Sequence, residues 1–114
     1  MEHISQSNAQ RFENGAVTSW EYEMQNANLN VAPILINGRY PENGYTSNQL
    51  SDSIVHIIGG SGTLTLNDGT TVELARNDQV HLAVGDAYYF EGKLELIYAA
   101  SPAWTPEQTK AVAD

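Results

Sequence analysis

The sequence predicts an all-β fold, a sandwich or a barrel, because short alternating runs separated by turn clusters recur along most of its 114 residues. The clearest unit is a hairpin, in which Thr63–Leu66 and Thr70–Leu74 alternate apolar and polar residues on either side of Asn67-Asp68-Gly69. An Asp-Gly step between two such runs is a strong hairpin signal. A helical pattern occurs only near the end of the chain. For a chain of this length a jelly roll is the natural all-β candidate.

Two strands are predicted in the first third of the chain. Ala16–Met24 alternates apolar and polar residues with one break near Ser19, which fits a bulge. Leu29–Ile36 is apolar but contains Pro33, which cannot donate a ladder hydrogen bond. This run is therefore an edge strand or is broken at the proline. The two Asn-Gly steps and the proline of Asn37–Tyr45 predict a loop.

Four more strands are predicted besides the hairpin. Ser53–Ile58 is a short β-branched run, and the glycines of Gly59–Gly62 are expected to end it. The other three are Gln79–Val84, Tyr88–Phe90 and Leu94–Ala99. Glu91–Lys93 is expected to form the turn that separates the last two.

The tail predicts a short helix. Thr105 is placed as the N-cap, Pro106 at the first helical position and Gln108 at the third, which is the pattern of a capping box. The residues that follow, up to Val112, allow barely two turns.

The charge balance excludes several classes of partner. Five Lys and Arg stand against fourteen Asp and Glu, giving a formal net charge of -9 at pH 7. Nucleic acids and anionic membranes bind through clustered cations that this chain lacks. The absence of cysteine excludes disulfides and thiolate metal sites. No run approaches the roughly 18 apolar residues of a membrane span and no secretory signal is visible, so a cytoplasmic location is expected.

Two segments carry a family resemblance. Ser53–Gly62 is a strand followed by glycines, with Gly60 in the closing position, and Gly38 stands where the same motif opens. Asp78–Tyr88 has the spacing acidic-x-Val-x-Ile-Pro-x-Gly-x-x-His, with Ala83 in place of the proline. These features resemble the two motifs of the cupin family, whose fold is a double-stranded β-helix, a form of jelly roll.

The resemblance implies one cupin domain over residues 1–114. Its N-terminal strands would cover 15–36, the barrel motifs 38–90, and the closing strand with its tail 94–114. The short C-terminal helix belongs to that last part.

The chain departs from the cupin pattern at the metal site. The four ligand positions of the family carry hydroxyl and amide side chains instead of three histidines and a glutamate. They are Ser53, Tyr88 and, in the loop, either Ser47 and Gln49 or Thr46 and Asn48 if the spacer is one residue longer. Such groups bind divalent transition metals weakly compared with imidazole or carboxylate. The sequence therefore predicts a cupin frame with no bound metal and no cofactor.

The two-residue period of a strand decides where the central histidines point. If Ser53 faces into the barrel, every second residue of 53–58 does too, and the same count turns Val80 and Leu82 inward. His56 and His81 then lie on the outer face. They are either surface histidines with ordinary hydrogen bonds, or a metal site or acid–base pair formed across the strands.

The same period leaves two large aliphatic side chains, Ile54 and Ile58, on the outer face, where they need cover. Either the N-terminal strand with Val17, Trp20 and Tyr22 covers them, or a second subunit does. Cupins commonly dimerise in this way, so a homodimer is expected.

Hydroxyl and amide groups gather at the predicted barrel mouth. The candidate ligand-binding residues are Arg39, Tyr40, Asn48, Gln49, Ser53 and Tyr88, with Tyr45, Ser47, Tyr98 and Trp104 as further contributors. Tyrosine offers an apolar face and a hydroxyl, and the amides both donate and accept. The set suits a small polar ligand such as a sugar or another metabolite, and Arg39 can hold one carboxylate or phosphate. A non-catalytic or regulatory binding protein is the first interpretation.

An enzyme remains open as the alternative. A metal-free cupin that resembles sugar epimerases or isomerases needs a histidine base and a tyrosine acid. Tyr88 can be the acid, but an inward base requires a one-residue slip that turns His56 into the barrel. A metal-dependent oxygenase that uses His56, His81 and Asp86 is the weaker option.

Overall fold

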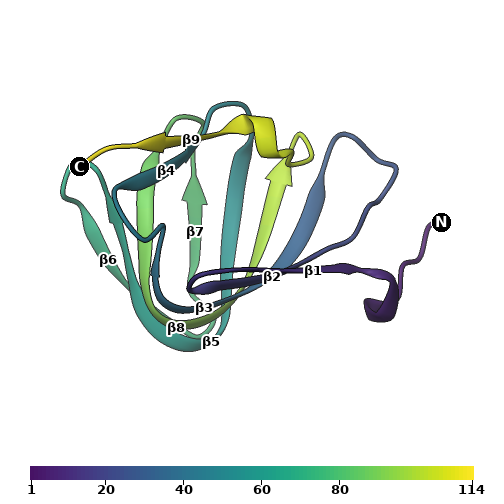
Figure 1. The fold of residues 1–114 in the computed structure, drawn as a ribbon, viewed down its shortest axis with the longest axis horizontal. Coiled ribbons are helices and arrows are strands. Elements are labelled where there is room, and N and C mark those ends of the chain that lie inside the picture. The colour runs from purple at the N-terminus through teal and green to yellow at the C-terminus, as the bar shows by residue number, and fades with distance from the viewer.

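The computed structural model describes all residues, 1–114, and its nine strands form one strongly curled sheet (Figure 1). The strands are β1 (Gln10–Asn14), β2 (Val17–Glu21), β3 (Asn30–Tyr40), β4 (Tyr45–Asn48), β5 (Asp52–Leu66), β6 (Thr71–Ala75), β7 (Gln79–Leu82), β8 (Ala87–Ser101) and β9 (Thr109–Val112). Two single 3-10 turns lie at Gln6–Asn8 and Pro106–Gln108. Neither turn approaches the length and apolar character that a membrane-crossing helix requires. The prediction of an all-β fold is confirmed.

The long strands β5 and β8 form the centre of the sheet. They pair antiparallel from Asp52↔Ser101 to Leu66↔Tyr88. The other edge of β8 pairs with β4 near the start of the strand and with β3 along the rest of it. The other edge of β5 pairs with β7 near the start of the strand and with β6 near its end. Because β3, β5 and β8 all bend midway, the sheet folds back on itself as a half-barrel, seen as a U in Figure 1.

A row of three glycines crosses the sheet at this bend. Gly38 of β3 lies opposite Gly92 of β8, which in turn lies opposite Gly62 of β5. Gly38 and Gly92 have φ angles of 123° and 136°, which side-chain-bearing residues rarely adopt. The predicted strand end at Gly59–Gly62 and the predicted turn at Glu91–Lys93 are therefore wrong. Both segments are bends within continuous strands, because glycine lets the backbones curve and approach closely.

The strand β3 is longer than predicted. Pro33 does not break it, because it lies just beyond Ile34, the last residue that β2 pairs with, so that edge of β3 is free beside the proline. At its other end β3 continues to Tyr40, and the predicted loop shrinks to residues 41–44.

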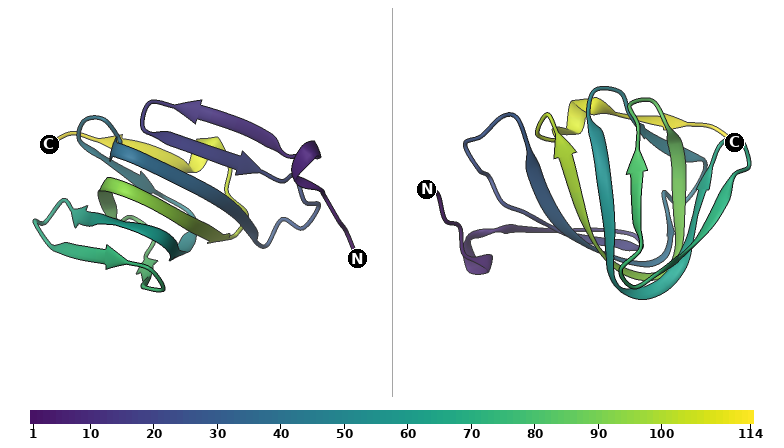
Figure 2. Two further views of the ribbon diagram at one scale, coloured as in Figure 1. Left: turned by 90° about the horizontal axis from the view of Figure 1, so that it is seen from below. Right: turned by 180° about the vertical axis from the view of Figure 1, so that it is seen from behind.

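The N-terminal hairpin extends the sheet instead of covering it. β1 was not predicted, since its five residues are all exposed and show no apolar alternation. It pairs with β2, and β2 pairs with β3 through only Val17, Thr18 and Ser19. The left view of Figure 2 shows this hairpin at one edge of the sheet, beyond β3.

The hydrophobic core lies between the two arms of the U. Its buried side chains are Ile36, Val55, Ile57, Leu64, Leu74, Leu82, Tyr88, Phe90, Leu94 and Leu96. The alternation predicted for 53–58 is confirmed, because Ser53, Val55 and Ile57 are at most 2% exposed while Ile54 and Ile58 are 37% and 43% exposed.

The tail forms a strand where a helix of nearly two turns was predicted. Helical geometry ends after the single turn Pro106–Gln108, and Thr105 makes no side-chain cap. β9 then pairs with the free edge of β4, from Asn48↔Thr109 to Tyr45↔Val112. Ladder hydrogen bonds along four residues stabilise this strand more than one further helical turn would stabilise a short helix.

Candidate binding site

Three tyrosines gather on the inner face of the half-barrel. Tyr40 lies near the end of β3, and Tyr88 and Tyr98 lie in opposite halves of β8. The bend in β8 turns its two halves toward each other, so Tyr88 has both Tyr98 and Tyr40 as neighbours. Tyr88 also packs edge-on against Phe90, with ring centroids 5.5 Å apart.

Two smaller hydroxyls complete what we call the hydroxyl cluster: Tyr40, Thr46, Ser53, Tyr88 and Tyr98. Ser53 Oγ donates a hydrogen bond of 2.6 Å to Tyr98 Oη, and Ser53 itself is 2% exposed. Thr46 of β4 is paired with Tyr88 and adjoins Tyr40. Tyr40 and Tyr98 are only partly buried, so the cluster reaches the surface.

The hydroxyl cluster is electrically neutral at physiological pH. Burial raises the pKa of Tyr88 well above its ordinary value, and the neighbouring Tyr98 and Tyr40 raise it further. Burial also raises the pKa of Tyr40. The residues that alternate inward along β3, β5 and β8 include no histidine and no carboxylate. The cluster can donate and accept hydrogen bonds, but it contains no group suited to be a general base near neutral pH.

The side chains at the family's metal positions do not fit a metal. Thr46 is paired with Tyr88 and therefore shares its inner face, as does Asn48 two residues along β4. With Ser53, these residues offer three hydroxyls and an amide, which are poor ligands for the transition metals that cupins use. No three His, Asp or Glu side chains come together elsewhere in the protein.

Asn48 holds the chain together at this end of the barrel. Its Oδ1 accepts hydrogen bonds from the backbone N–H groups of Leu50 and Ser51, at 2.9 and 2.7 Å. Its Nδ2 donates to Gln108 Oε1 at 3.1 Å. Most of its hydrogen-bonding capacity is thus used within the protein.

Gln108 is the partner that sequence reasoning missed. It is 7% exposed, its Oε1 also accepts from Ser51 Oγ at 2.9 Å, and its Nε2 donates to the carbonyl of Ala103 at 2.9 Å. These contacts anchor the turn that precedes β9. The sequence predicted only a local contact for Gln108, within the capping box that begins at Thr105. No sequence pattern indicated a contact with Asn48, sixty residues away.

Two other candidates lie outside the barrel. The guanidinium of Arg39 donates to the carbonyls of Pro41, Glu42 and Gly44 at 3.2, 2.8 and 3.0 Å, and it lies 3.9 Å from the ring centroid of Tyr89. It therefore fastens the loop 41–44 on the outer face.

Gln49 is exposed, and its Nε2 donates to Ser47 Oγ at 2.8 Å. Of the further contributors, Tyr45 stacks on Tyr89 and faces outward, with ring centroids 5.7 Å apart. The backbone N–H of Trp104 donates to Asn30 Oδ1 at 3.1 Å. Of all the candidates, the structure brings together Tyr40, Ser53, Tyr88 and Tyr98.

A groove of about 420 Å³ runs along the starts of β3 and β5 and the end of β8, and Ser53 lines it. At its rim His81 Nε2 and Asp52 Oδ1 are 2.9 Å apart, and both side chains are more than half exposed. His56 has a different partner, Gln79 Oε1, at 3.1 Å. The two histidines therefore face outward with separate partners, and the slip that would turn His56 inward does not occur.

The curled half-barrel is the fold of the cupins, as comparison with solved structures shows. Pac13, described as a unique nucleoside dehydratase, superposes with a TM-score of 0.89 at 15% identity, covering 99% of this chain and 92% of that one. Ectoine synthase from P. lautus gives 0.71 at 14% identity, over 90% of this chain and 80% of that one. For oxalate decarboxylase from Bacillus subtilis the TM-score is 0.81 at 12% identity, over 96% of this chain and only 31% of that one.

Three structures of Streptomyces Pac13 contain uridine, in two tyrosine-to-phenylalanine variants and one histidine-to-glutamine variant. No protein-family model matches this chain. No curated protein matches it either. At these identities the likeness establishes the fold, and the family resemblance of the two sequence motifs is confirmed at that level.

Proposed function

We propose that this protein binds a small neutral polar molecule in its barrel through the hydroxyl cluster, without a metal ion and without turning it over. The observation that carries the proposal is the 2.6 Å hydrogen bond between Ser53 and Tyr98, beside the hydroxyls of Tyr88 and Tyr40. Ser53 also lines the groove of about 420 Å³, and the partly exposed Tyr40 and Tyr98 connect the cluster to solvent.

The chemistry of the cluster favours a sugar-bearing ligand. Hydroxyls donate and accept hydrogen bonds, and so pair with the hydroxyls of a sugar, while the tyrosine rings offer apolar faces. The absence of charged side chains on the inner face argues against an ionic ligand, because a buried charge needs a partner. The likeness to Pac13, which has been solved with uridine, makes a nucleoside the first ligand to test.

A metal-free enzyme is the second candidate, and the likeness to a nucleoside dehydratase is the observation that favours it. Such an enzyme needs a base near neutral pH. His56 and His81 face outward, so the base would have to come from the ligand or from a second subunit.

Titration calorimetry with uridine, and then with neutral hexoses, tests the first proposal. Removing one neutral hydrogen bond costs about 0.5–1.5 kcal/mol, so Tyr98→Phe and Ser53→Ala should each weaken binding about two- to twelvefold. Tyr45→Phe removes a hydroxyl from the outer face and is the matched control, expected to leave the affinity unchanged. Equal affinities in all three variants would reject the hydroxyl cluster as the site.

Two further measurements separate the alternatives. Metal analysis after incubation with iron, manganese, nickel and zinc should find far less than one ion per chain, and a chelator should not alter ligand affinity. Mass spectrometry of the incubated ligand should find it unchanged. Loss of water from the ligand, abolished in Tyr88→Phe, would favour the enzyme.

A further inference from the structure

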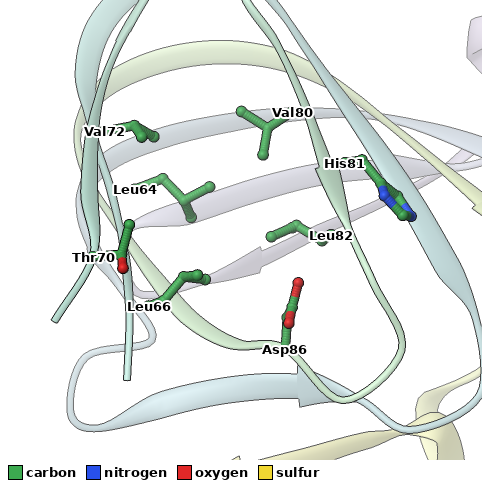
Figure 3. Close-up of a pocket in the computed structure, with 8 residues that line it drawn as sticks. All are labelled: Leu64, Leu66, Thr70, Val72, Val80, His81, Leu82 and Asp86. Atoms are coloured by element: carbon green, nitrogen blue, oxygen red, sulfur yellow. The ribbon is translucent and has the colours of Figure 1, made fainter. Parts of the chain in front are cut away.

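The wall of the half-barrel is interrupted between β6 and β7. Each of these strands pairs with β5, and neither pairs with the other. A hollow of about 90 Å³ occupies this gap (Figure 3). It is separate from the hydroxyl cluster, none of whose residues lines it.

Aliphatic side chains form the walls of the hollow. Leu64 and Leu66 come from β5, Val72 from β6, and Val80 and Leu82 from β7. In Figure 3 the side chains from β5 and β6 face those from β7 across the gap. Val72 is 42% exposed although it belongs to the inner face, because no strand closes the wall beside it.

Two polar side chains lie at the rim of the hollow, Asp86 at the bottom of Figure 3 and Thr70 at its left. Thr70 lies in the turn between β5 and β6, and Asp86 in the turn between β7 and β8. A hydrogen bond of 2.9 Å from the backbone N–H of Asn67 to the carbonyl of Ala87 joins these two turns. His81, the remaining lining residue, extends away from the centre toward its partner Asp52.

Asp86 brings a negative charge to this rim with no cation of the protein beside it. Its Oδ2 accepts a hydrogen bond of 2.9 Å from the backbone N–H of Ala83, and its side chain is half-buried. The only ion pairs in the structure are Arg11 with Glu13 and His81 with Asp52. The net charge of -9 raises the local concentration of cations.

We propose that this hollow binds a small branched alkylammonium group, with the alkyl part between β6 and β7 and the ammonium on the Asp86 carboxylate. Thr70 Oγ1 is a further hydrogen-bond acceptor in the lining. An apolar cavity of about 150 Å³ accommodates benzene, so the smaller hollow suits a four-carbon group. The hollow should prefer such a ligand over an alcohol of the same shape, which has no charge to pair with Asp86. It should also prefer it over an acid of the same shape, whose charge Asp86 repels.

The test is an NMR titration of the methyl groups of Leu64, Val72 and Leu82 with isobutylamine, which is protonated at neutral pH. Isobutanol carries the same alkyl group without the charge, and methylamine carries the charge without the alkyl group. We expect isobutylamine to shift these methyl resonances and to bind more tightly than either control. Its affinity should fall as salt is added.

Two matched variants isolate the carboxylate. Asp78 caps its own turn as Asp86 does, since Asp78 Oδ2 accepts from the backbone N–H of Ala75 at 2.8 Å, but it lies outside the hollow. Asp86→Asn keeps an acceptor for the turn and removes the charge, so it should weaken isobutylamine binding about fivefold, the upper end for a partly exposed ion pair. Asp78→Asn should change the affinity by less than about twofold.

A third variant tests the apolar part. Val72→Phe places a ring over the hollow and should abolish the shifts of the Leu64 and Leu82 methyl groups while the protein remains folded. The proposal is overturned if isobutanol binds as tightly as isobutylamine, or if Asp86→Asn and Asp78→Asn have equal effects. It is also overturned if isobutylamine at high concentration shifts no methyl group of the hollow.

Discussion

Tyr88 and Tyr98 belong to the same strand, and yet their side chains are neighbours across the interior of the half-barrel. In a straight strand ten residues would separate them by about 33 Å. The bend of β8 at Gly92 brings its two halves face to face. The glycine row Gly38–Gly92–Gly62 is thus what assembles the hydroxyl cluster, although none of the three glycines is part of it.

Gly92→Ala should destabilise the protein strongly. Gly92 has a φ of 136°, and a Cβ there would lie 2.6 Å from both the Cα of Gly62 and the carbonyl oxygen of Ser61. We expect the free energy of unfolding, measured with denaturant, to fall by about 3 kcal/mol or more. Gly69→Ala is the control, because Gly69 also has a positive φ but open space around it, and it should cost about 1 kcal/mol. Equal losses would show that close approach of the strands is unimportant.

The buried tyrosines should make the fold less stable at high pH. Burial raises the pKa of Tyr88 and of Tyr40, so the folded protein holds these phenol protons more firmly than the unfolded chain does. Below about pH 10 these two phenols are protonated in both states and do not alter the stability. Above it the unfolded tyrosines ionise first, and stability is lost as the pH rises through the folded pKa values, by up to about 1.4 kcal/mol per pH unit for each group.

Ultraviolet absorbance of tyrosinate checks this prediction. Part of the absorbance of the six tyrosines should appear only when the protein unfolds in alkali. Tyr88→Phe should reduce that late part. If every tyrosine titrates before circular dichroism detects unfolding, Tyr88 is accessible to hydroxide and the prediction is wrong.

Asn48→Ala should act on stability more than on binding. The substitution leaves the backbone N–H groups of Leu50 and Ser51 without their acceptor and removes a donor from Gln108. A buried group left without a partner costs about 1–3 kcal/mol, which thermal unfolding will detect. Asn43→Ala, in an exposed loop, should cost little. A stable Asn48→Ala protein with weakened ligand binding would return Asn48 to the binding site.

We propose that the outer face around Ile54 pairs with a second copy of the chain. The exposed aliphatic residues Val31, Leu35, Ile54 and Ile58 lie on β3 and β5, the strands on either side of β8, and the N-terminal hairpin extends the sheet without covering them. The one charged contact beside Ile54 is the internal ion pair of His81 and Asp52. Glu95 of β8, exposed between Leu35 and Gly59, also lies on this face, so the aliphatic side chains and not the charges favour the pairing.

Light scattering measures the outcome of this pairing. Ile54→Glu should shift the mass toward that of one chain, because it places a charge in the apolar face. Leu50→Glu alters an aliphatic residue that is 58% exposed and lies outside these strands, so it should leave the mass unchanged. A wild-type protein that is already monomeric at high concentration would refute the dimer.

Local patterns in the sequence were sufficient for several features. Period-two alternation placed Ser53 and Ile54 on opposite faces of the strand, because successive side chains of a strand point to opposite sides, and Ser53 proved to be the buried one. The Asp68-Gly69 turn was equally determined, since few residues other than glycine accept its φ of 93°. The all-β class followed from such short-range signals, whereas the cupin-like frame was implied by the resemblance of Ser53–Gly62 and Asp78–Tyr88 to the two motifs of the family.

The tertiary structure decided whatever depends on partners distant in the sequence. A glycine at a bend and a glycine at a turn look alike until the opposite strand is known, so the sequence predicts a strand end at Gly62 and a turn at Gly92. Likewise, a polar residue near the barrel mouth can serve a ligand or the fold. The side chains of Arg39 and Asn48 form hydrogen bonds within the protein, with loop carbonyls and with Gln108 respectively. Tyr98 lies beside Tyr88 only because the strand between them bends. Alternation and turns arise from the geometry of a few adjacent residues, whereas the site is formed by contacts across the barrel that no local pattern encodes.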